Sequence, residues 1–406
     1  MNHLKKKEIC FLLSNDATRD PRVSKEAKSA VDLGLKVTIL SFYWHSDQNK
    51  YSKKEYRDEI FIYRGEYFPT VWDFRYGYFN NLIIKIMNIL VKIISYNVYN
   101  YYLSMTKFFV RKGTESKFDI VHANDLDTLM AGYLIKKKTG AKLVYDAHEI
   151  WTDSGLTLPW ILISIFNIIE KIFLRKTDAF ISVNRSILRE ILQRHKISYQ
   201  GIMEPIYNCP RYIKHSLKKK QEQKIKILYQ GGCIPGRGIE ELGLAARFLP
   251  DNAQVIIRAL GSQDIINKVK EIKKKYRLGN KLVIDAPVAP EKLIDSARKA
   301  DIGVIANQPN NINNYLVAPN KLFEYMTAGL ALAVSDLPEL NKIIKENKNG
   351  VVFDSTRPEC IANALKKIIR NPEKLQKMKQ NSLRAARKYN WENEEIKLRK
   401  IYKELL

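Results

Sequence analysis

One stretch towards the C-terminal end constrains the fold more than any other. The apolar segment Asp301 to Ala306 is followed by an Asn-rich loop, then by Pro319-Asn320-Lys321-Leu322-Phe323-Glu324-Tyr325-Met326-Thr327-Ala328-Gly329, and then by the apolar segment Leu330 to Val334. This order predicts a strand, a loop, a helix and a second strand, with Asn320 as the helix N-cap and Gly329 as its stop. A helix between two such strands indicates a parallel α/β sheet.

The start of this predicted helix is suited to binding an anion. Its first amides have no partner within the helix and carry the positive end of its dipole, so the backbone at Pro319 and Asn320 can hold a phosphate, and Lys321 adds a charge. Glu324 lies one turn further on, where a carboxylate can accept hydrogen bonds from the two hydroxyls of a ribose. A solvent-exposed pair of Glu324 with Lys321 is the alternative.

The N-terminal region predicts a second unit of the same kind. Glu8 to Leu13 is a predicted strand, Asp20 to Leu33 a predicted helix with Asp20 as N-cap, and Leu35 to Ser41 the next strand. The first apolar run ends at Leu13, so we interpret it as a strand and not as a signal peptide. The turn between the first strand and the helix lies at the carboxyl edge of the sheet, where three side chains can meet an anionic acceptor: Asp16, Arg19 and Arg22. Pairing of the two arginines with Asp16 and Asp20 is the alternative.

Two further strands end in polar residues. The segments 118–125 and 142–149 place Asp125, His148 and Glu149 at the carboxyl edge of the first sheet. Asp125-Leu126-Asp127 has the DxD pattern that binds a metal diphosphate in another architecture. Because it opens the predicted helix 126–138, we expect N-capping by Asp125 instead.

The second half of the chain contains a glycine-rich turn. Gly231 to Gly238 separates the predicted strand Ile225 to Gln230 from the predicted helix Ile239 to Phe248, and glycines in this position let backbone amides approach a phosphate. The turn lacks the GK[ST] ending of a Walker A loop. Two further predicted strands end next to Gly261 and Val288.

Length and charge limit the possible functions. With 406 residues, 45% hydrophobic and 28% charged, the chain is predicted to form two globular domains. A net charge of +26 favours phosphorylated small molecules, an anionic membrane face or nucleic acid as partners, unless the lysines only solvate the surface. No aromatic stacking platform accompanies the lysines, so nucleic acid is not an expected partner. The four cysteines have no CxxC spacing and are expected to be reduced thiols, with no metal site.

Two segments have amphipathic or apolar character. Residues 80–110 predict a long helix with a lysine stripe, which either packs on the sheet or lies at a membrane interface, and residues 156–174 are a second candidate. Neither has the about 20 uninterrupted apolar residues of a membrane span.

The stretch PNKLFEYMTAG resembles the donor-site helix of retaining GT-B glycosyltransferases of the family 4 type, which build bacterial surface polysaccharides, and Asp146-Ala147-His148-Glu149 resembles the family's active-site His segment. The similarity covers nearly the whole chain. It implies an α/β fold of GT-B type, with two doubly wound Rossmann-like domains facing an interdomain cleft. The implied domains are an acceptor domain over 1–207, a linker over 208–223, a nucleotide-sugar domain over 224–388 and a terminal helix over 389–406 that crosses back to the first domain.

The resemblance also implies roles for single residues. Glu324 holds the ribose, His148 contacts the donor sugar or the acceptor hydroxyl, and Arg237 clamps the diphosphate, whereas Gly232 stands where the family has another basic residue and Leu316 where it has a second Glu. Catalysis is thus expected from His148, Arg237 and Lys321. The expected donor site comprises Gly231, Gly232, Arg237, Gly261, Val288, Pro319, Asn320, Lys321 and Glu324, and the expected acceptor side comprises Asp16, Arg19, Arg22, Asp125 and Glu149.

The implied activity is transfer of a sugar, with retention, from a UDP- or GDP-type donor to a glycan or polyprenyl-linked acceptor. No metal or cofactor is expected, and the expected location is the cytoplasm, peripherally at the anionic inner face of the membrane. Two alternatives stay open: a sugar-nucleotide epimerase on the same fold, and a non-catalytic protein that binds membranes or nucleic acid.

Overall fold

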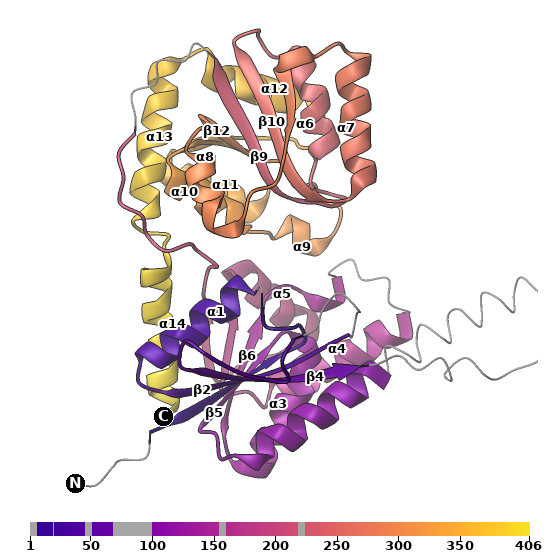
Figure 1. The fold of residues 1–406 in the computed structure, drawn as a ribbon, viewed down its shortest axis with the longest axis vertical. Coiled ribbons are helices and arrows are strands. Elements are labelled where there is room, and N and C mark those ends of the chain that lie inside the picture. The colour runs from indigo at the N-terminus through magenta and orange to yellow at the C-terminus, as the bar shows by residue number, and fades with distance from the viewer. Residues whose placement is uncertain (1–5, 19, 45–50, 68–99, 154–159, 218–223) are drawn as a thin grey trace, which may run out of the picture. The chain divides into compact units, whose positions relative to one another are not determined.

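The computed structural model describes residues 6–18, 20–44, 51–67, 100–153, 160–217 and 224–406. The chain forms two compact units: unit 1 contains Met1–Ile206 and Glu395–Leu406, and unit 2 contains Tyr207–Glu394. Each unit has one largely parallel β-sheet with helices packed on it (Figure 1). The predicted fold class, two doubly wound Rossmann-like α/β domains, is therefore confirmed.

Within the described residues, the sheet of unit 1 has eight strands in the order β3-β4-β2-β1-β5-β6-β7-β8. Only β3 runs antiparallel to its neighbour. The order reverses between β1 and β5, the two central strands. The strands are β1 (Glu8–Leu13), β2 (Lys36–Trp44), β3 (Lys54–Arg57), β4 (Ile60–Tyr67), β5 (Ile120–Asn124), β6 (Lys142–Ala147), β7 (Ala179–Ser182) and β8 (Ile202–Pro205).

The first helix of unit 1 begins and ends as predicted. The Asp20 side chain accepts hydrogen bonds from the amides of Arg22 and Val23, and Gly34 follows the helix with a φ of 94°. Right-handed crossovers place α1 and α3 on opposite faces, because β1 to β2 and β5 to β6 run in opposite directions across the sheet (Figure 1). The helices are α1 (Pro21–Asp32), residues 100–115, α3 (Leu126–Thr139), α4 (Trp160–Leu174) and α5 (Arg185–His195), with a 3-10 turn, η2 (Trp151–Asp153).

The sheet of unit 2 has six parallel strands in the order β11-β10-β9-β12-β13-β14. This is the doubly wound order, in which the first strand and the fourth lie together at the centre. The strands are β9 (Ile225–Cys233), β10 (Ala253–Gly261), β11 (Leu282–Asp285), β12 (Ile302–Ile305), β13 (Ala331–Ser335) and β14 (Gly350–Phe353).

Alternation along these strands builds two hydrophobic cores, one on each face of the sheet. Ile227 and Tyr229 of β9 enter the core under α6, α7 and α12, whereas Leu228 between them enters the core under α10 and α11. The helices are α6 (Ile239–Ala245), α7 (Gln263–Lys275), α8 (Leu293–Ala297), α9 (Ile312–Tyr315), α10 (Asn320–Ala328), α11 (Pro338–Asn347), α12 (Pro358–Ile369), α13 (Pro372–Ala386) and α14 (Trp391–Leu405).

Some predicted boundaries are wrong. Strand β9 continues through Gly231 and Gly232, because Gly231 still pairs with Ala259 of β10, so the glycine-rich turn is shorter than predicted. The helix predicted over 80–110 lies largely outside the described residues, which are helical from 100 to 115. Among the helices that the structure describes, none combines the length and the apolar character needed to cross a membrane.

Packing at the centre of unit 2 gives a test of the fold. A Cβ at Gly303 of β12 would lie 2.3 Å from the buried ring of Tyr325, so Gly303→Ala should lower the free energy of unfolding by about 1–3 kcal/mol. Gly243→Ala in α6 is the matched control, because the nearest atoms to its Cβ lie at 3.7 Å or more. We expect the control to match or exceed wild-type stability in urea unfolding. Equal effects of the two substitutions would contradict this packing.

Candidate functional site

The candidate site of unit 2 lies where β9 and β12 separate. These two central strands last pair at Leu228 and Gly303. Beyond that point the hydroxyl of Tyr325 accepts a hydrogen bond from the amide of Gln230 at 2.7 Å and takes the place of a strand partner. Ligands of doubly wound sheets bind outside the carboxyl ends of the strands where the order reverses, which is here.

The turn after β9 requires glycine at two positions. Gly238 has a φ of 63°, and a Cβ there would lie 2.1 Å from the carbonyl oxygen of Ala306. Gly236 has a φ of 80°, and its carbonyl accepts a hydrogen bond from the amide of Gln308 at 2.8 Å. The turn is thus held against the loop that follows β12, and Arg237 lies between the two glycines.

Lys321 carries a buried amine. It is the second residue of α10 and only 9% exposed, and its Nζ lies 3.9 Å from the centre of the Tyr229 ring. Among the described residues Nζ has no hydrogen-bond partner. Burial, reinforced by the charge of Arg237, lowers the pKa of Lys321 to about 7, although Glu324 acts in the opposite direction. A buried donor of this kind needs an explanation, and an anionic ligand is one.

Arg237 brings a second positive charge to the same place. Its half-buried side chain acts electrostatically on both Lys321 and Tyr229. Neither cation forms an ion pair with a residue that the structure describes. Glu324, half-buried, lies one helical turn after Lys321 on α10. The structure therefore brings Arg237, Lys321 and Glu324 together, as the sequence predicted.

The start of α10 differs in detail from the prediction. Pro319, not Asn320, is the N-cap, and it makes no side-chain capping hydrogen bond. Asn320 is the first helical residue and is exposed. Gly329 ends the helix with a φ of 74°, as predicted. Without a capping side chain, the first amides of this helix stay available to a ligand.

The other predicted donor-site residues lie along the same edge. A Cβ at Gly231 would lie 3.1 Å from Nζ of Lys321, and the carbonyl of Gly232 accepts a hydrogen bond from Tyr229 at 2.7 Å. Gly261 is the last residue of β10. A Cβ at this position would lie 2.5 Å from the carbonyl oxygen of Cys233. Half-buried Val288 after β11 completes the predicted set. Leu316, which stands where the family has a second Glu, is buried at the end of α9.

In unit 1, His148 lies between two carboxylates. Its Nδ1 is 3.3 Å from Asp125 and its Nε2 is 3.3 Å from Asp146. Burial opposes the charged ring, but Asp125 and Asp146 outweigh it and raise the pKa of His148 to about 10. The two carboxylates therefore favour the charged imidazolium, which donates hydrogen bonds, over the neutral ring that a general base requires.

Asp125 does not cap the helix that follows it, so that prediction is wrong. Its φ of 61° turns the side chain away from α3, and its carboxylate instead accepts a hydrogen bond from the His148 amide at 3.0 Å. Burial raises the pKa of Asp125 to about 7 despite the opposing charge of His148. The structure thus confirms that Asp125 and His148 are neighbours.

Arg22 was predicted to face an acceptor, and the structure contradicts this. Its guanidinium is buried and donates two hydrogen bonds to Asp146, at 2.7 and 2.8 Å, and one to the carbonyl of Ile206 at 2.7 Å. The Arg22 guanidinium also forms an ion pair with Glu26 at 3.0 Å. The alternative prediction, an ion pair of this side chain with Asp16 or Asp20, is therefore wrong as well. Although burial opposes it, Arg22 then holds the pKa of Asp146 well below its usual range.

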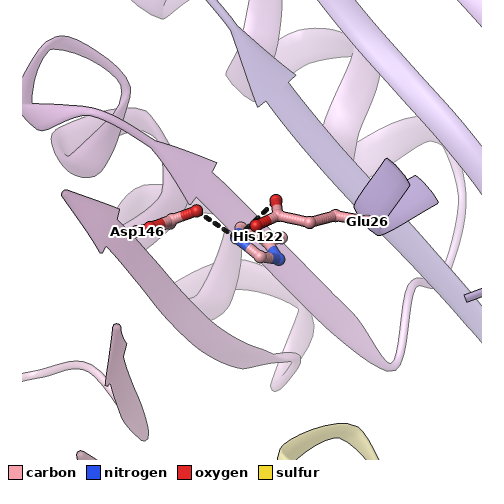
Figure 2. A group of neighbouring side chains, drawn as sticks. All are labelled: Glu26, His122 and Asp146. Atoms are coloured by element: carbon pink, nitrogen blue, oxygen red, sulfur yellow. Dashed lines mark ion pairs between the residues drawn. The ribbon is translucent and has the colours of Figure 1, made fainter. Parts of the chain in front are cut away.

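Glu26, His122 and Asp146 form a buried group beside Arg22, and their ligand atoms lie within 4.8 Å of one another (Figure 2). Three such side chains could hold a metal ion. Arg22 already supplies the positive charge, however, and His122 contacts the Tyr402 hydroxyl at 2.8 Å. A cation would have to displace the guanidinium, so we assign this group to the structure of unit 1.

The remaining acceptor-side residues are more scattered. The carboxylate of half-buried Asp16 accepts a hydrogen bond from the Thr18 amide at 2.8 Å. Glu149 is half-buried next to His148. Arg19 lies outside the described residues. The structure therefore brings Glu149 together with His148 and Asp125, and leaves Asp16 in the turn after β1.

Two residues of these sites were missed. Burial raises the pKa of Asp127 to about 6, against a hydrogen bond with Ser14, so the second acid of the DxD pattern is also part of this polar edge. Tyr229 lies directly under the Lys321 amine. The sequence did carry a signal for Tyr229: successive residues of β9 point to alternate faces of the sheet, so Tyr229 lies on the same face as Ile227.

Two family models match the chain, one for each half. Residues 27–208 match Glycosyltransferase Family 4, and residues 213–385 match Glycosyl transferases group 1. No curated protein sequence matches the chain. Between them the two models cover most of the sequence, and the fold has two Rossmann-like domains. The chain is therefore a GT-B glycosyltransferase of the family 4 type, which confirms that part of the resemblance.

Solved structures share this fold over nearly the whole chain. Sucrose-phosphate synthase from Thermosynechococcus elongatus has 14% identity and a TM-score of 0.72, covering 98% of this chain and 99% of that one. A glycosyltransferase from Rickettsia africae has 15% identity and a TM-score of 0.68, covering 99% of both chains. HepE from Anabaena, in complex with UDP and glucose, has 14% identity and a TM-score of 0.65, covering 98% of both chains. At these identities the similarity shows the fold alone.

The buried amine of Lys321 makes stability depend on pH. Its pKa is about 7 in the folded protein and 10.5 ordinarily, so between these values the unfolded chain binds the extra proton. Lys321 therefore makes the free energy of unfolding increase as pH rises from about 7 to 10. Lys321→Met removes the effect and should be more stable than wild type at pH 7 and below, with an advantage that disappears towards pH 10. Urea unfolding across this range measures the difference, and a difference independent of pH would contradict a buried, uncompensated amine.

Proposed function

We propose that this glycosyltransferase moves a sugar from a UDP- or GDP-type nucleoside diphosphate sugar to a hydroxyl of a glycan or polyprenyl-linked acceptor. The observation that carries the proposal is the pair of Lys321 and Arg237. Both cations lie at the point where β9 and β12 separate, and neither forms an ion pair with a described residue. A diphosphate supplies two negative charges for this place, and Glu324 one turn later can accept hydrogen bonds from the attached ribose.

The same two cations suit the chemistry of transfer. As the bond between the anomeric carbon and the diphosphate breaks, negative charge builds up on the leaving oxygen. Lys321 and Arg237, preorganised by α10 and by the turn after β9, stabilise that charge. Loss of Arg237 should therefore cost about 3 kcal/mol of transition-state stabilisation, as for other preorganised electrostatic donors.

The acceptor is assigned to the polar edge of unit 1. His148, held as a cation between Asp125 and Asp146, has a side chain that is 20% exposed and can present that edge to a sugar oxygen. Asp125, with a pKa of about 7, is next to it and can interact with the attacking hydroxyl. An uncharged hydroxyl suits this edge, where the charges of Arg22 and Asp146 already neutralise each other.

The finer parts of the proposal come from the family resemblance and from related structures. HepE, whose structure contains UDP and glucose, supports a UDP-type donor. The resemblance supports retention at the anomeric carbon, chemistry without a resident metal or cofactor, and a place in surface polysaccharide synthesis. The net charge of +26 supports work at the anionic cytoplasmic face of a membrane.

Product analysis tests the proposal. The purified protein is incubated with UDP- and GDP-sugars, with and without oligosaccharide or polyprenyl-phosphate-linked acceptors, and the products are analysed by mass spectrometry and NMR. We expect a new glycosidic bond whose anomeric configuration equals that of the donor. An epimerised sugar nucleotide formed without acceptor would show an epimerase instead.

Two substitutions should separate donor binding from transfer. Glu324→Ala should raise the dissociation constant of the nucleotide donor by about tenfold or more, because a hydrogen bond to a charged group contributes about 1.5–3 kcal/mol. His148→Ala should keep donor affinity and lower the transfer rate by about a hundredfold. Calorimetry and initial rates on the same preparations measure both. Unchanged affinity in Glu324→Ala would remove that residue from the donor site, and full activity in His148→Ala would remove the histidine from the reaction.

A further inference from the structure

Helix α4 (Trp160–Leu174) exposes a continuous row of large apolar side chains. Their exposed fractions are 75% for Trp160, 52% for Ile161, 44% for Ile165, 56% for Ile168 and 47% for Ile172. Spacings of four, three and four residues place Ile161, Ile165, Ile168 and Ile172 on one face of the helix, and Trp160 stands at its first position; we name these five residues the α4 apolar face. Other exposed large apolar residues of the described chain are not grouped along one helix in this way. A contiguous patch of this kind marks an interaction surface.

The fold holds α4 in this orientation. Glu170, on the opposite side, is buried and accepts a hydrogen bond from the Tyr145 hydroxyl at 2.7 Å while its other oxygen lies 2.7 Å from Nε2 of His195. Phe166 packs on Trp151, with ring centres 4.5 Å apart. Rotating the helix to bury its apolar face would break both contacts and leave a buried carboxylate unpaired, which is costly. The exposure is therefore built into unit 1.

The charge around the C-terminal end of α4 is positive. Lys171, Arg175 and Lys176 are exposed and continue the apolar face by one turn. The end of α3 adjoins them, because Lys136 donates a hydrogen bond to the Lys176 carbonyl at 2.9 Å, and it adds further lysines at 137 and 138. Nearby Asp178 is already paired with Lys136 and Lys142, so it does not cancel this charge.

We propose that the α4 apolar face seats the protein on an anionic lipid bilayer. A helix of 15 residues is about 22 Å long and can lie in the interface with its apolar side chains among the acyl chains, where Trp160 suits the headgroup level. The basic end of the helix then meets anionic headgroups. A second copy of this chain would bring the same positive charge to the contact and is disfavoured. Through this surface the enzyme would reach a lipid-linked acceptor. The choice of that acceptor rests on the proposed function.

Vesicle co-sedimentation tests the proposal on the full chain. The wild type should bind vesicles of phosphatidylglycerol and phosphatidylcholine, and bind phosphatidylcholine alone much more weakly. Trp160→Ser/Ile168→Ser should weaken binding by about a hundredfold, because each buried side chain accounts for about a factor of ten. Arg175→Gln/Lys176→Gln should weaken binding to the anionic vesicles by about thirtyfold. Ile396→Ser, at a residue that is 66% exposed on α14, is the matched control and should bind like wild type.

A second readout locates the contact. Brominated lipids should quench tryptophan fluorescence in the wild type, and Trp160→Phe, which keeps an apolar side chain, should bind but lose most of that quenching. Wild-type binding by Trp160→Ser/Ile168→Ser would overturn the proposal.

Thermal unfolding and sedimentation without lipid identify other occupants of the face. The double variant should unfold at the wild-type temperature and show the same molecular mass. A drop of several degrees would mean that another segment of this chain covers the face, and loss of a dimer would mean that a second copy does. Either result would overturn the proposal. A protein that binds nucleotide donor but no vesicle would also overturn it, while leaving the proposed donor site standing.

Discussion

The separation of β9 from β12 is the constraint on which unit 2 depends. The hydroxyl of Tyr325 occupies the gap and accepts the Gln230 amide, which fixes α10 over the ends of the strands. Gly303 leaves the room that the tyrosine ring needs. Lys321, one turn before Tyr325 on the same helix, is then held inside the protein next to Arg237, with no described carboxylate paired to either. Because burying an uncompensated charge is costly, this site gains stability when an anion enters it.

Unit 1 uses the same sheet plan with the opposite electrostatic result. Its strand order also reverses at the centre, between β1 and β5, but here Arg22 and Asp146 neutralise each other through two hydrogen bonds. His148 is charged as well, and it lies between the carboxyl groups of Asp125 and Asp146. The same sheet plan thus gives unit 2 two cations with no described carboxylate paired to either. It gives unit 1 a polar edge where cations and carboxylates face one another. That division suits a reaction between an anionic donor and a neutral hydroxyl.

Local signals in the sequence were enough for much of the fold and for part of the site. The Asp20 cap, the Gly329 stop and the spacing of Lys321 and Glu324 each depend on a few neighbouring residues, and the structure has them as predicted. Arg22 was misassigned because its partner Asp146 is 124 residues away and nothing near Arg22 reveals it. Asp125 was misassigned because its positive φ is not visible in the sequence. The length of the turn after β9 depended on pairing of Gly231 with β10, which is again a long-range contact.

The proposed function requires an anion site at Lys321 in unit 2, and one measurement tests for that site directly. Thermal unfolding of the wild type and of Lys321→Met is followed against nucleoside diphosphates of each base and their sugar conjugates. A ligand at about 100 times its dissociation constant adds about 2.7 kcal/mol, so we predict a clear rise in the wild-type unfolding temperature with one base and a much smaller rise in the variant. No shift with any nucleotide, or equal shifts in the two proteins, would contradict the account.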